Sequence, residues 1–261
     1  MAVAALCATA VAFAPQNAPR SRGNALAGWL DNFLPKPLTP EEFEADRRER
    51  WPEQYAAVLD EVAAPLAGDE GVALRVRPLL ARTQLEARPL RVAYDAARDG
   101  WSPAAFHGAV DASGAAVVYA RTTRGLELGG YNPKGWASMG NARPSPAAFL
   151  FAFDRGEGEP MPATKLRSAS HIGCNSVAFD APTKGIDFGV EAFAVPLRED
   201  EPRRARSKLG VYYEKRPDGG ETLWTGGASS VELDELLVLV GVYPEGHDIE
   251  YSGAVMDMTS G

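Results

Sequence analysis

Short apolar runs separated by glycine, proline and aspartate fill the chain from about Val76 onward, and this spacing limits the fold more than any other feature. Runs of this length between turn residues are typical of β-strands. No alternation of strand and helix recurs, which argues against a doubly wound parallel sheet. The pattern predicts a mostly β fold of the α+β class, with a two-sheet antiparallel β-sandwich and a few peripheral helices.

The apolar runs predict nine strands, near residues 90–94, 115–121, 126–131, 147–153, 177–179, 188–196, 209–215, 222–225 and 235–243. Residues 236–242 are nearly all apolar, which suits a central strand buried on both faces. Residues 216–220 read Arg-Pro-Asp-Gly-Gly and predict a tight turn that joins two strands as a hairpin. Ser102 before Pro103 predicts the N-cap of a helix that runs to about Val110.

A helical neck is predicted over residues 39–75, ahead of the main block. Thr39 and Glu42 have the spacing of a capping box, which marks a helix start. The helix is expected to run through Arg50 and to break near Pro52, because proline disfavours a helical residue before it. A second helical face is predicted by the spacing of Tyr55, Val58, Leu59 and Val62, ended by Pro65, Gly68 and Gly71.

Residues 1–38 have the composition of a targeting presequence. Residues 1–14 are small and apolar, and the stretch behind them holds three basic residues and one acid, as signal and transit sequences do. The Ala-Phe-Ala-Pro junction at residues 12–15 is similar to the bipartite presequence of algae with secondary plastids. The prediction is import into a plastid, to the stroma; a secretory signal or a disordered tail is the alternative. Residues 76–243 are then the main domain, and residues 244–261 a flexible tail.

Charge and composition exclude several classes of protein. The 261 residues carry 27 basic and 35 acidic side chains, a formal net charge of −8, which argues against a nucleic-acid binder held by phosphate contacts. No run of 18 apolar residues occurs, so no transmembrane segment is expected. Two cysteines, Cys7 and Cys174, are too few for a disulfide framework or a cysteine-rich zinc site. We expect no metal and no cofactor.

Short motifs in the right order resemble those of the TLDc domain family, of the oxidation-resistance type, across residues 79–243. The family has an Arg-Asp-Gly-aromatic turn and a Phe-Gly-Gly-Tyr segment followed by tryptophan, and leucine replaces that first phenylalanine here. The matching segments are LRVAYD at 90–95, RDGW at 98–101, FH at 106–107, LGGY at 128–131 with Trp136, FLF at 149–151, DFG at 187–189 and SKLGVYY at 207–213.

The signature residues are expected to maintain the fold. Two adjacent glycines inside a strand indicate a bulge or a close backbone approach, and large aromatic side chains bury much apolar area. An Arg-Asp pair in a turn is expected to stabilise that turn, by at most about 1 kcal/mol if exposed. The set is Arg98, Asp99, Gly100, Trp101, Gly129, Gly130, Trp136, Phe188 and Gly189.

The resemblance implies a non-enzymatic binding or stress-protection module that works through a protein partner. TLDc proteins are tied to oxidative-stress resistance, and several bind the vacuolar-type proton ATPase. A plastid has no such ATPase, so a different partner is expected if the chain is imported there. An accessory subunit of a plastid membrane complex is a further alternative.

Enzyme chemistry remains an alternative from a different class. No Gly-x-Ser-x-Gly elbow, phosphate-binding loop or His-Glu-x-x-His motif is present. Cys174 lies close to His171 in sequence, and a peroxide- or thiol-linked activity would centre on Cys174 or on His107. The simpler interpretations are an inert thiol and a hydrogen-bonded structural histidine.

One basic cluster interrupts the acidic chain. Its members are Arg203, Arg204, Arg206 and Lys208. Acidic residues at 199–201 precede it, which favours a solvated mixed-charge loop. Docking of an acidic partner surface or a lipid headgroup is the functional alternative.

Overall fold

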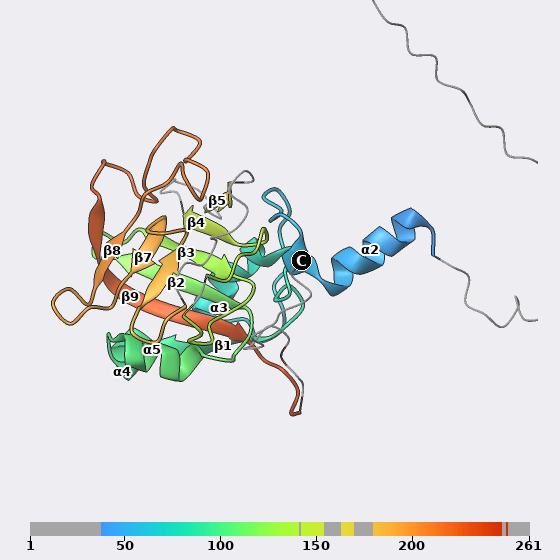
Figure 1. Cartoon of the computed structure of the whole chain (residues 1–261), viewed down its shortest axis with the longest axis horizontal. Helices are drawn as coiled ribbons and strands as arrows, with labels where there is room; N and C mark the ends of the chain where they lie inside the picture. The colour runs from blue at the N-terminus through green and yellow to red at the C-terminus, as the bar shows by residue number, and fades with distance from the viewer. Residues whose placement is uncertain (1–37, 141, 154–162, 170–179, 247–248, 250–261) are drawn as a thin grey trace, which may run out of the picture. The chain divides into compact units, whose positions relative to one another are not determined.

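The structure, a computed structural model, describes residues 38–140, 142–153, 163–169, 180–246 and 249. Nearly all of the predicted presequence, the strand predicted near 177–179 and most of the predicted tail lie outside these residues. The described chain is mostly β, with nine antiparallel strands in one sheet and a few short helices (Figure 1). The predicted α+β class is therefore confirmed.

The first helix within the described residues is α2, Pro40–Arg50. Its capping box forms as predicted: the Glu42 amide donates to Thr39 Oγ1 at 3.2 Å, and the Thr39 amide donates to Glu42 Oε2 at 2.8 Å. These two bonds satisfy backbone groups that the first turn of a helix leaves unpaired. The helix ends at Arg50, and the 3₁₀ turn η1 (Pro52–Gln54) follows.

The prediction of a second neck helix over residues 55–62 is wrong. The chain there is irregular, and its backbone bonds run to distant segments: the Ala57 amide donates to the Pro146 carbonyl, and the Ala63 amide to the Pro78 carbonyl. These tertiary contacts replace the local bonds that the apolar spacing predicted. The helix of this region comes later, as α3 (Gly71–Val76), followed by the 3₁₀ turn η2 (Arg77–Leu80).

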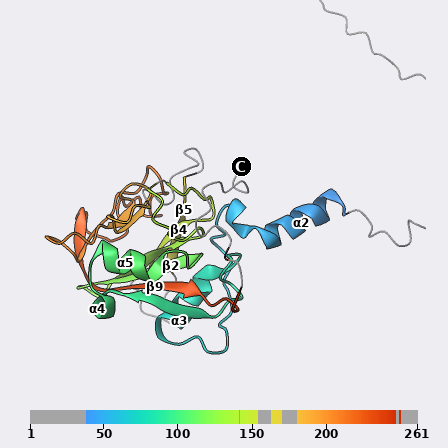
Figure 2. The same cartoon turned by 60° about the horizontal axis from the view of Figure 1, so that its bottom comes forward.

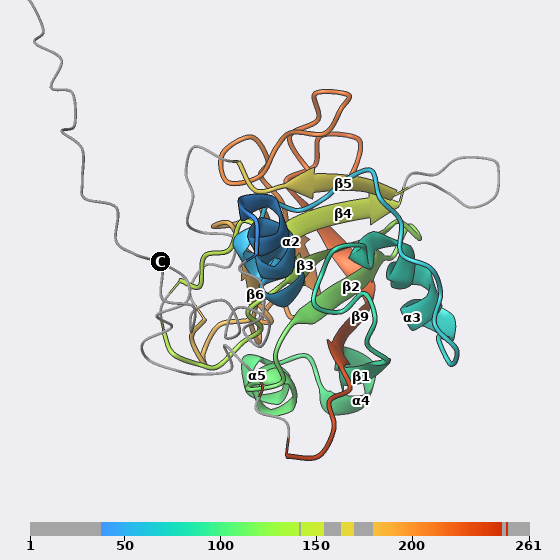
Figure 3. The ribbon, with the colours of Figure 1, turned by 90° about the vertical axis from the view of Figure 1, so that its right-hand side faces the viewer.

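The sheet has the strand order β5-β4-β3-β2-β9-β8-β7-β6, and β1 pairs with β9 beside this path. Figure 3 shows β5, β4, β3, β2 and β9 in succession. The bounds are β1 Leu90–Asp95, β2 Ala116–Thr122, β3 Glu127–Asn132, β4 Phe149–Phe153, β5 Ala163–Arg167, β6 Ile186–Phe188, β7 Phe193–Val195, β8 Arg204–Arg206 and β9 Ser230–Gly241.

Strand β9 lies at the centre and joins the two halves of the sheet. Along one edge it pairs with β2, and along the other it pairs with β8 near Ser230 and with β1 near Gly241 (Figure 1). Residues 236–241 of β9 are all buried, which confirms the central strand that the apolar run predicted. The last apolar residue of that run, Val242, lies outside the strand and is 43% exposed.

The two halves of the sheet face each other across one core, which makes the fold sandwich-like. Val118 and Leu150 from β2 and β4 share a buried cluster with Phe188 and Val195 from β6 and β7. Two short helices, α4 (Ala96–Asp99) and α5 (Pro103–Val110), lie beside it, and α5 adds its buried apolar face to the cluster. The predicted N-cap is present, because Ser102 Oγ accepts from the Ala105 amide at 3.2 Å.

A second core lies on the opposite face of β2, β3 and β4. Val117 and Tyr119 of β2 point into it, whereas Val118 points into the first core, as the two-residue period of a strand requires. The segment that covers this face includes α3 and residues Leu79 and Leu80. Figure 2 shows α3 on the opposite side of β9 from α5. Strands β2, β3 and β4 are thus buried on both faces.

Three strand predictions need correction. The run 188–196 forms two strands, β6 and β7, because Gly189, Val190 and Glu191 turn the chain with positive φ. The runs 209–215 and 222–225 are not strands: the Gly210 amide closes a tight turn on the Tyr213 carbonyl. The predicted turn at 216–220 does form, since the Arg216 amide donates to the Gly220 carbonyl, but it does not connect two strands.

Two strands were not predicted. Strand β5 lies at one end of the sheet path and contains Lys165 and Arg167 among its five residues. Strand β8 is three residues long and lies within the basic cluster, so its charged pattern hid it. Short edge strands with charged side chains give little hydrophobic signal.

Candidate functional site

The Arg-Asp-Gly-Trp turn connects β1 to α5 through α4. Arg98 and Asp99 form a bidentate ion pair with two contacts of 2.7 Å, as predicted for this turn. Asp99 also accepts from the Asp95 amide, and these bonds hold its pKa down, at about 2. Trp101 packs against the first core, and the Arg203 guanidinium lies 5.0 Å from its ring centre. The pair is exposed, so its role is to shape the turn.

The glycine pair on β3 lets this strand lie close to its neighbours in the fold. A Cβ on Gly129 would lie 1.9 Å from the Val118 carbonyl oxygen of β2. A Cβ on Gly130 would lie 2.9 Å from both Leu150 and Phe188. Neighbouring atoms therefore approach both glycines closely, as the sequence predicted.

An aromatic cluster fills the space between α5 and the sheet. Trp136 is 1% exposed and contacts Phe106 edge-on, with ring centres 5.1 Å apart. Trp136 also contacts Phe188, with ring centres 6.3 Å apart. Gly189, the next residue, has φ +59, and a Cβ there would meet Tyr212 at 2.6 Å. Trp136 and Phe188 therefore pack the core, and Gly189 turns the chain.

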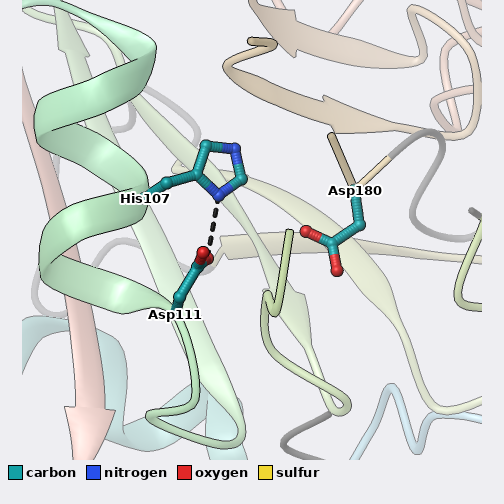
Figure 4. Close-up of side chains that lie close together, drawn as sticks. All are labelled: His107, Asp111 and Asp180. Carbon is teal, nitrogen blue, oxygen red and sulfur yellow. Dashed lines mark hydrogen bonds and ion pairs between the residues drawn. The ribbon is translucent and has the colours of Figure 1, made fainter. Parts of the chain in front are cut away.

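A polar group, which we call the His107 cluster, interrupts this apolar region at the end of α5 (Figure 4). It consists of His107, Asp111, Ser138 and Asp180. His107 Nδ1 lies 2.8 Å from Asp111 Oδ1, one helical turn away, and 3.1 Å from Ser138 Oγ. His107 Nε2 lies 2.9 Å from the Lys184 carbonyl oxygen. The Ser138 hydroxyl also donates to Asp111 Oδ2.

Asp180 closes the cluster from the opposite side. Its carboxylate accepts from the amides of Ala137 at 2.9 Å and Ser138 at 3.0 Å. Arg143 Nη1 lies 3.7 Å from Asp180 Oδ2. In Figure 4 the Asp180 carboxylate points toward the His107–Asp111 pair. His107 and Asp180 are 5% and 1% exposed, whereas Asp111 and Ser138 are half-buried, so the cluster lies at the edge of the core.

The geometry does not build a Ser-His-Asp catalytic triad. In such a triad the serine and the aspartate bond to different nitrogens of the histidine, so that a proton passes across the ring. Here Ser138 and Asp111 both face Nδ1, and Nε2 is held by a carbonyl. Cys174, the other predicted catalytic candidate, lies outside the described residues. Sequence reasoning identified His107 but missed Asp111, Ser138 and Asp180.

The basic cluster lies along β8 and lines an open cleft of about 780 Å³. Arg204 and Arg206 both contact Glu201, and Arg206 also lies 3.4 Å from Glu191. The cleft wall holds further acids, Asp218 and Glu221, beside Lys208, Arg216 and Trp224. Arg203 faces Trp101 instead and does not line this cleft. The surface is mixed in charge rather than uniformly basic.

Near this cleft, Asp187 on β6 has an unusual carboxyl group. Burial raises its pKa to about 6, although its Oδ1 accepts from the Glu191 amide at 2.8 Å. Because the pKa is higher in the folded chain than in the unfolded chain, folding favours the protonated carboxyl. This contribution is fully present below about pH 4 and is lost as pH rises through about 6.

We expect Asp187→Asn to raise the free energy of unfolding by about 1 kcal/mol at pH 7.5 and to change little at pH 4. The figure is below the full linkage value because the side chain is partly exposed. Urea unfolding at both pH values measures the difference. Asp218→Asn is the matched control: hydrogen bonds lower the pKa of Asp218, so this variant should show no such gain. An Asp187→Asn chain less stable than the parent at pH 7.5 would contradict the expectation.

The fold and these sites define a mostly β, sandwich-like module whose signature residues shape turns and cores. Residues 73–201 match the family model of the TLDc domain. The match spans β1 to β7 and ends before β8 and β9. No curated protein matches the chain. Among the described residues, no helix is long and apolar enough to cross a membrane.

Proposed function

We propose that this chain is a TLDc-type binding module that supports oxidative-stress resistance through a protein partner, in a plastid if residues 1–38 act as the import signal. The TLDc domain at residues 73–201 supports the class. The observation that carries the proposal is the cleft along β8, which is open, built from both charges and bounded by the Gly-rich segment 226–230. Complementary charge on such a surface selects partners and steers their encounter.

The burial of the His107 side chain favours binding over catalysis at this residue. Both ring nitrogens have partners within 3.1 Å, and the residue is 5% exposed. A general base needs a path to substrate within hydrogen-bond reach. The cleft along β8 offers instead an accessible area with several charged contacts.

The test is chemical cross-linking and affinity capture with the full chain in a lysate of its own organelle. We expect one near-stoichiometric partner, captured at least tenfold less by the variant Arg204→Glu/Arg206→Glu. Arg91→Glu, an exposed arginine on β1 outside the cleft, is the matched control and should capture normally. Cells that carry each variant should survive peroxide in proportion to the amount of partner that the variant captures. A partner retained by the double variant, or no partner at all, would contradict the proposal.

A further inference from the structure

The His107 cluster contains a nitrogen and two carboxylates arranged as metal ligands, and we propose that it binds a divalent transition-metal ion of the Zn²⁺ type. His107, Asp111 and Asp180 each offer one ligand atom, and these atoms lie within 4.8 Å of one another. Ser138 Oγ is a further oxygen beside them. This proposal is independent of partner binding at the cleft.

The tautomer of His107 provides the first argument. The Lys184 carbonyl only accepts hydrogen bonds, so the contact at 2.9 Å requires a proton on Nε2. In a neutral ring Nδ1 then carries a lone pair, and this lone pair faces Asp111 Oδ1 at 2.8 Å. Two lone pairs at that distance repel each other unless a proton or a metal ion lies between or beside them. The proton would be a second ring proton or a proton on the Asp111 carboxyl, and the metal ion would be bound by both side chains.

The surroundings match those of a bound metal. Histidine ligands usually donate their other ring N–H to a carbonyl or carboxylate, which fixes the ring, and Lys184 provides that carbonyl. Asp180 is similarly oriented by two backbone amides. Asp111 is the C-cap of α5, and the carbonyl end of a helix favours a cation.

Charge also permits a cation here. Arg143, 3.7 Å from Asp180, balances one of the two carboxylates, and the group keeps a negative charge with His107 neutral. Zinc bonds to nitrogen and carboxylate oxygen are about 2.0–2.2 Å long, so two ligand atoms of one tetrahedral ion lie about 3.3 Å apart. Asp111 Oδ1, which is 2.8 Å from His107 Nδ1, must therefore move slightly away from that nitrogen to admit the ion. An imidazole with two carboxylates suits Zn²⁺ or Mn²⁺ better than Mg²⁺.

The test is calorimetric titration of the purified full chain, stripped with chelator, with Zn²⁺ and separately with Mg²⁺. We expect one Zn²⁺ per chain, a higher melting temperature with zinc, and no comparable binding of Mg²⁺. Asp111→Asn and Asp180→Asn should each weaken zinc binding at least tenfold. A control chain with His171→Asn, His247→Asn and Cys174→Ser removes other zinc-binding side chains and should bind as the parent does.

A second readout does not depend on substitutions. Nitrogen-15 NMR of the His107 ring in the full chain reports each nitrogen separately. Zinc should shift the Nδ1 resonance to that of a coordinated nitrogen and leave Nε2 protonated. If the parent binds no zinc, or if zinc binds while the Nδ1 resonance and the two aspartate variants are unaffected, the proposal is wrong. A doubly protonated ring that persists with excess zinc would identify the positive charge as a proton.

Discussion

Replacing Arg77 by methionine should lower the free energy of unfolding by about 3–5 kcal/mol, the largest loss that we expect from a single side chain here. The Arg77 side chain is 0% exposed and lies at the start of η2. Two of its N–H groups bind the Asp69 carboxylate at 2.7 and 2.8 Å. The others donate to the carbonyls of Leu85, Glu86 and Arg88.

Methionine fills similar space but leaves Asp69 as a buried carboxylate without its cation. The Arg77 contacts hold the pKa of Asp69 below its usual value, and its side chain is 3% exposed. The carbonyls of residues 85, 86 and 88 lose their shared donor at the same time. Uncompensated buried charge is the main cost, so the double variant Asp69→Leu/Arg77→Met should recover part of the loss.

Urea unfolding of the full chain measures this effect, with Arg82→Met as the matched control. Arg82 binds Glu61 at 2.7 Å, but both side chains are exposed, at 65% and 49%. Exposed ion pairs contribute about 0–1 kcal/mol, so the control should remain near the parent. Equal losses for the two arginine variants would contradict the role assigned to Arg77.

Gly129→Ala should cost at least about 3 kcal/mol or prevent folding, although it adds only one methyl group. That methyl would lie 1.9 Å from the Val118 carbonyl oxygen and 2.7 Å from the Phe151 ring. The first neighbour is backbone in a paired strand and cannot rotate away. Strands β2 and β3 would have to separate, and both cores include residues of these two strands.

The matched control is Gly108→Ala. Gly108 lies on the exposed side of α5, and a Cβ there meets nothing within 4 Å. Alanine should stabilise this helix by about 0.5–1 kcal/mol. Thermal unfolding of both variants separates a steric effect from a general effect of removing glycine. A Gly129→Ala chain as stable as the parent would show that the strands can adjust.

The long regular elements could be predicted from sequence, and the short ones could not. Strands β1 to β4 and β9 each have at least five residues and are rich in apolar or aromatic side chains, so local pattern locates them. Strands β6, β7 and β8 have three residues each, too few for any period to show. The run at 209–215 has the apolar density of a strand, but Gly210 has φ +92 and turns the chain.

The same limit applies to the His107 cluster. The spacing of His107 and Asp111 places both on one helical face, and that signal was available in the sequence. Ser138 and Asp180 come from loops that only the folded sheet brings to α5. The buried Arg77–Asp69 pair was missed for a related reason, since charged residues are usually exposed.

The position of β9 has a consequence for biosynthesis. This strand is translated last among the nine, yet it pairs with β1, β2 and β8. While the ribosome is still making residues 1–229, one edge of β2 has no partner strand, and β1 cannot join the sheet. An unpaired apolar edge is a template for aggregation, and late long-range pairing slows folding. The nascent chain is therefore expected to need chaperone protection until residues 230–241 have emerged.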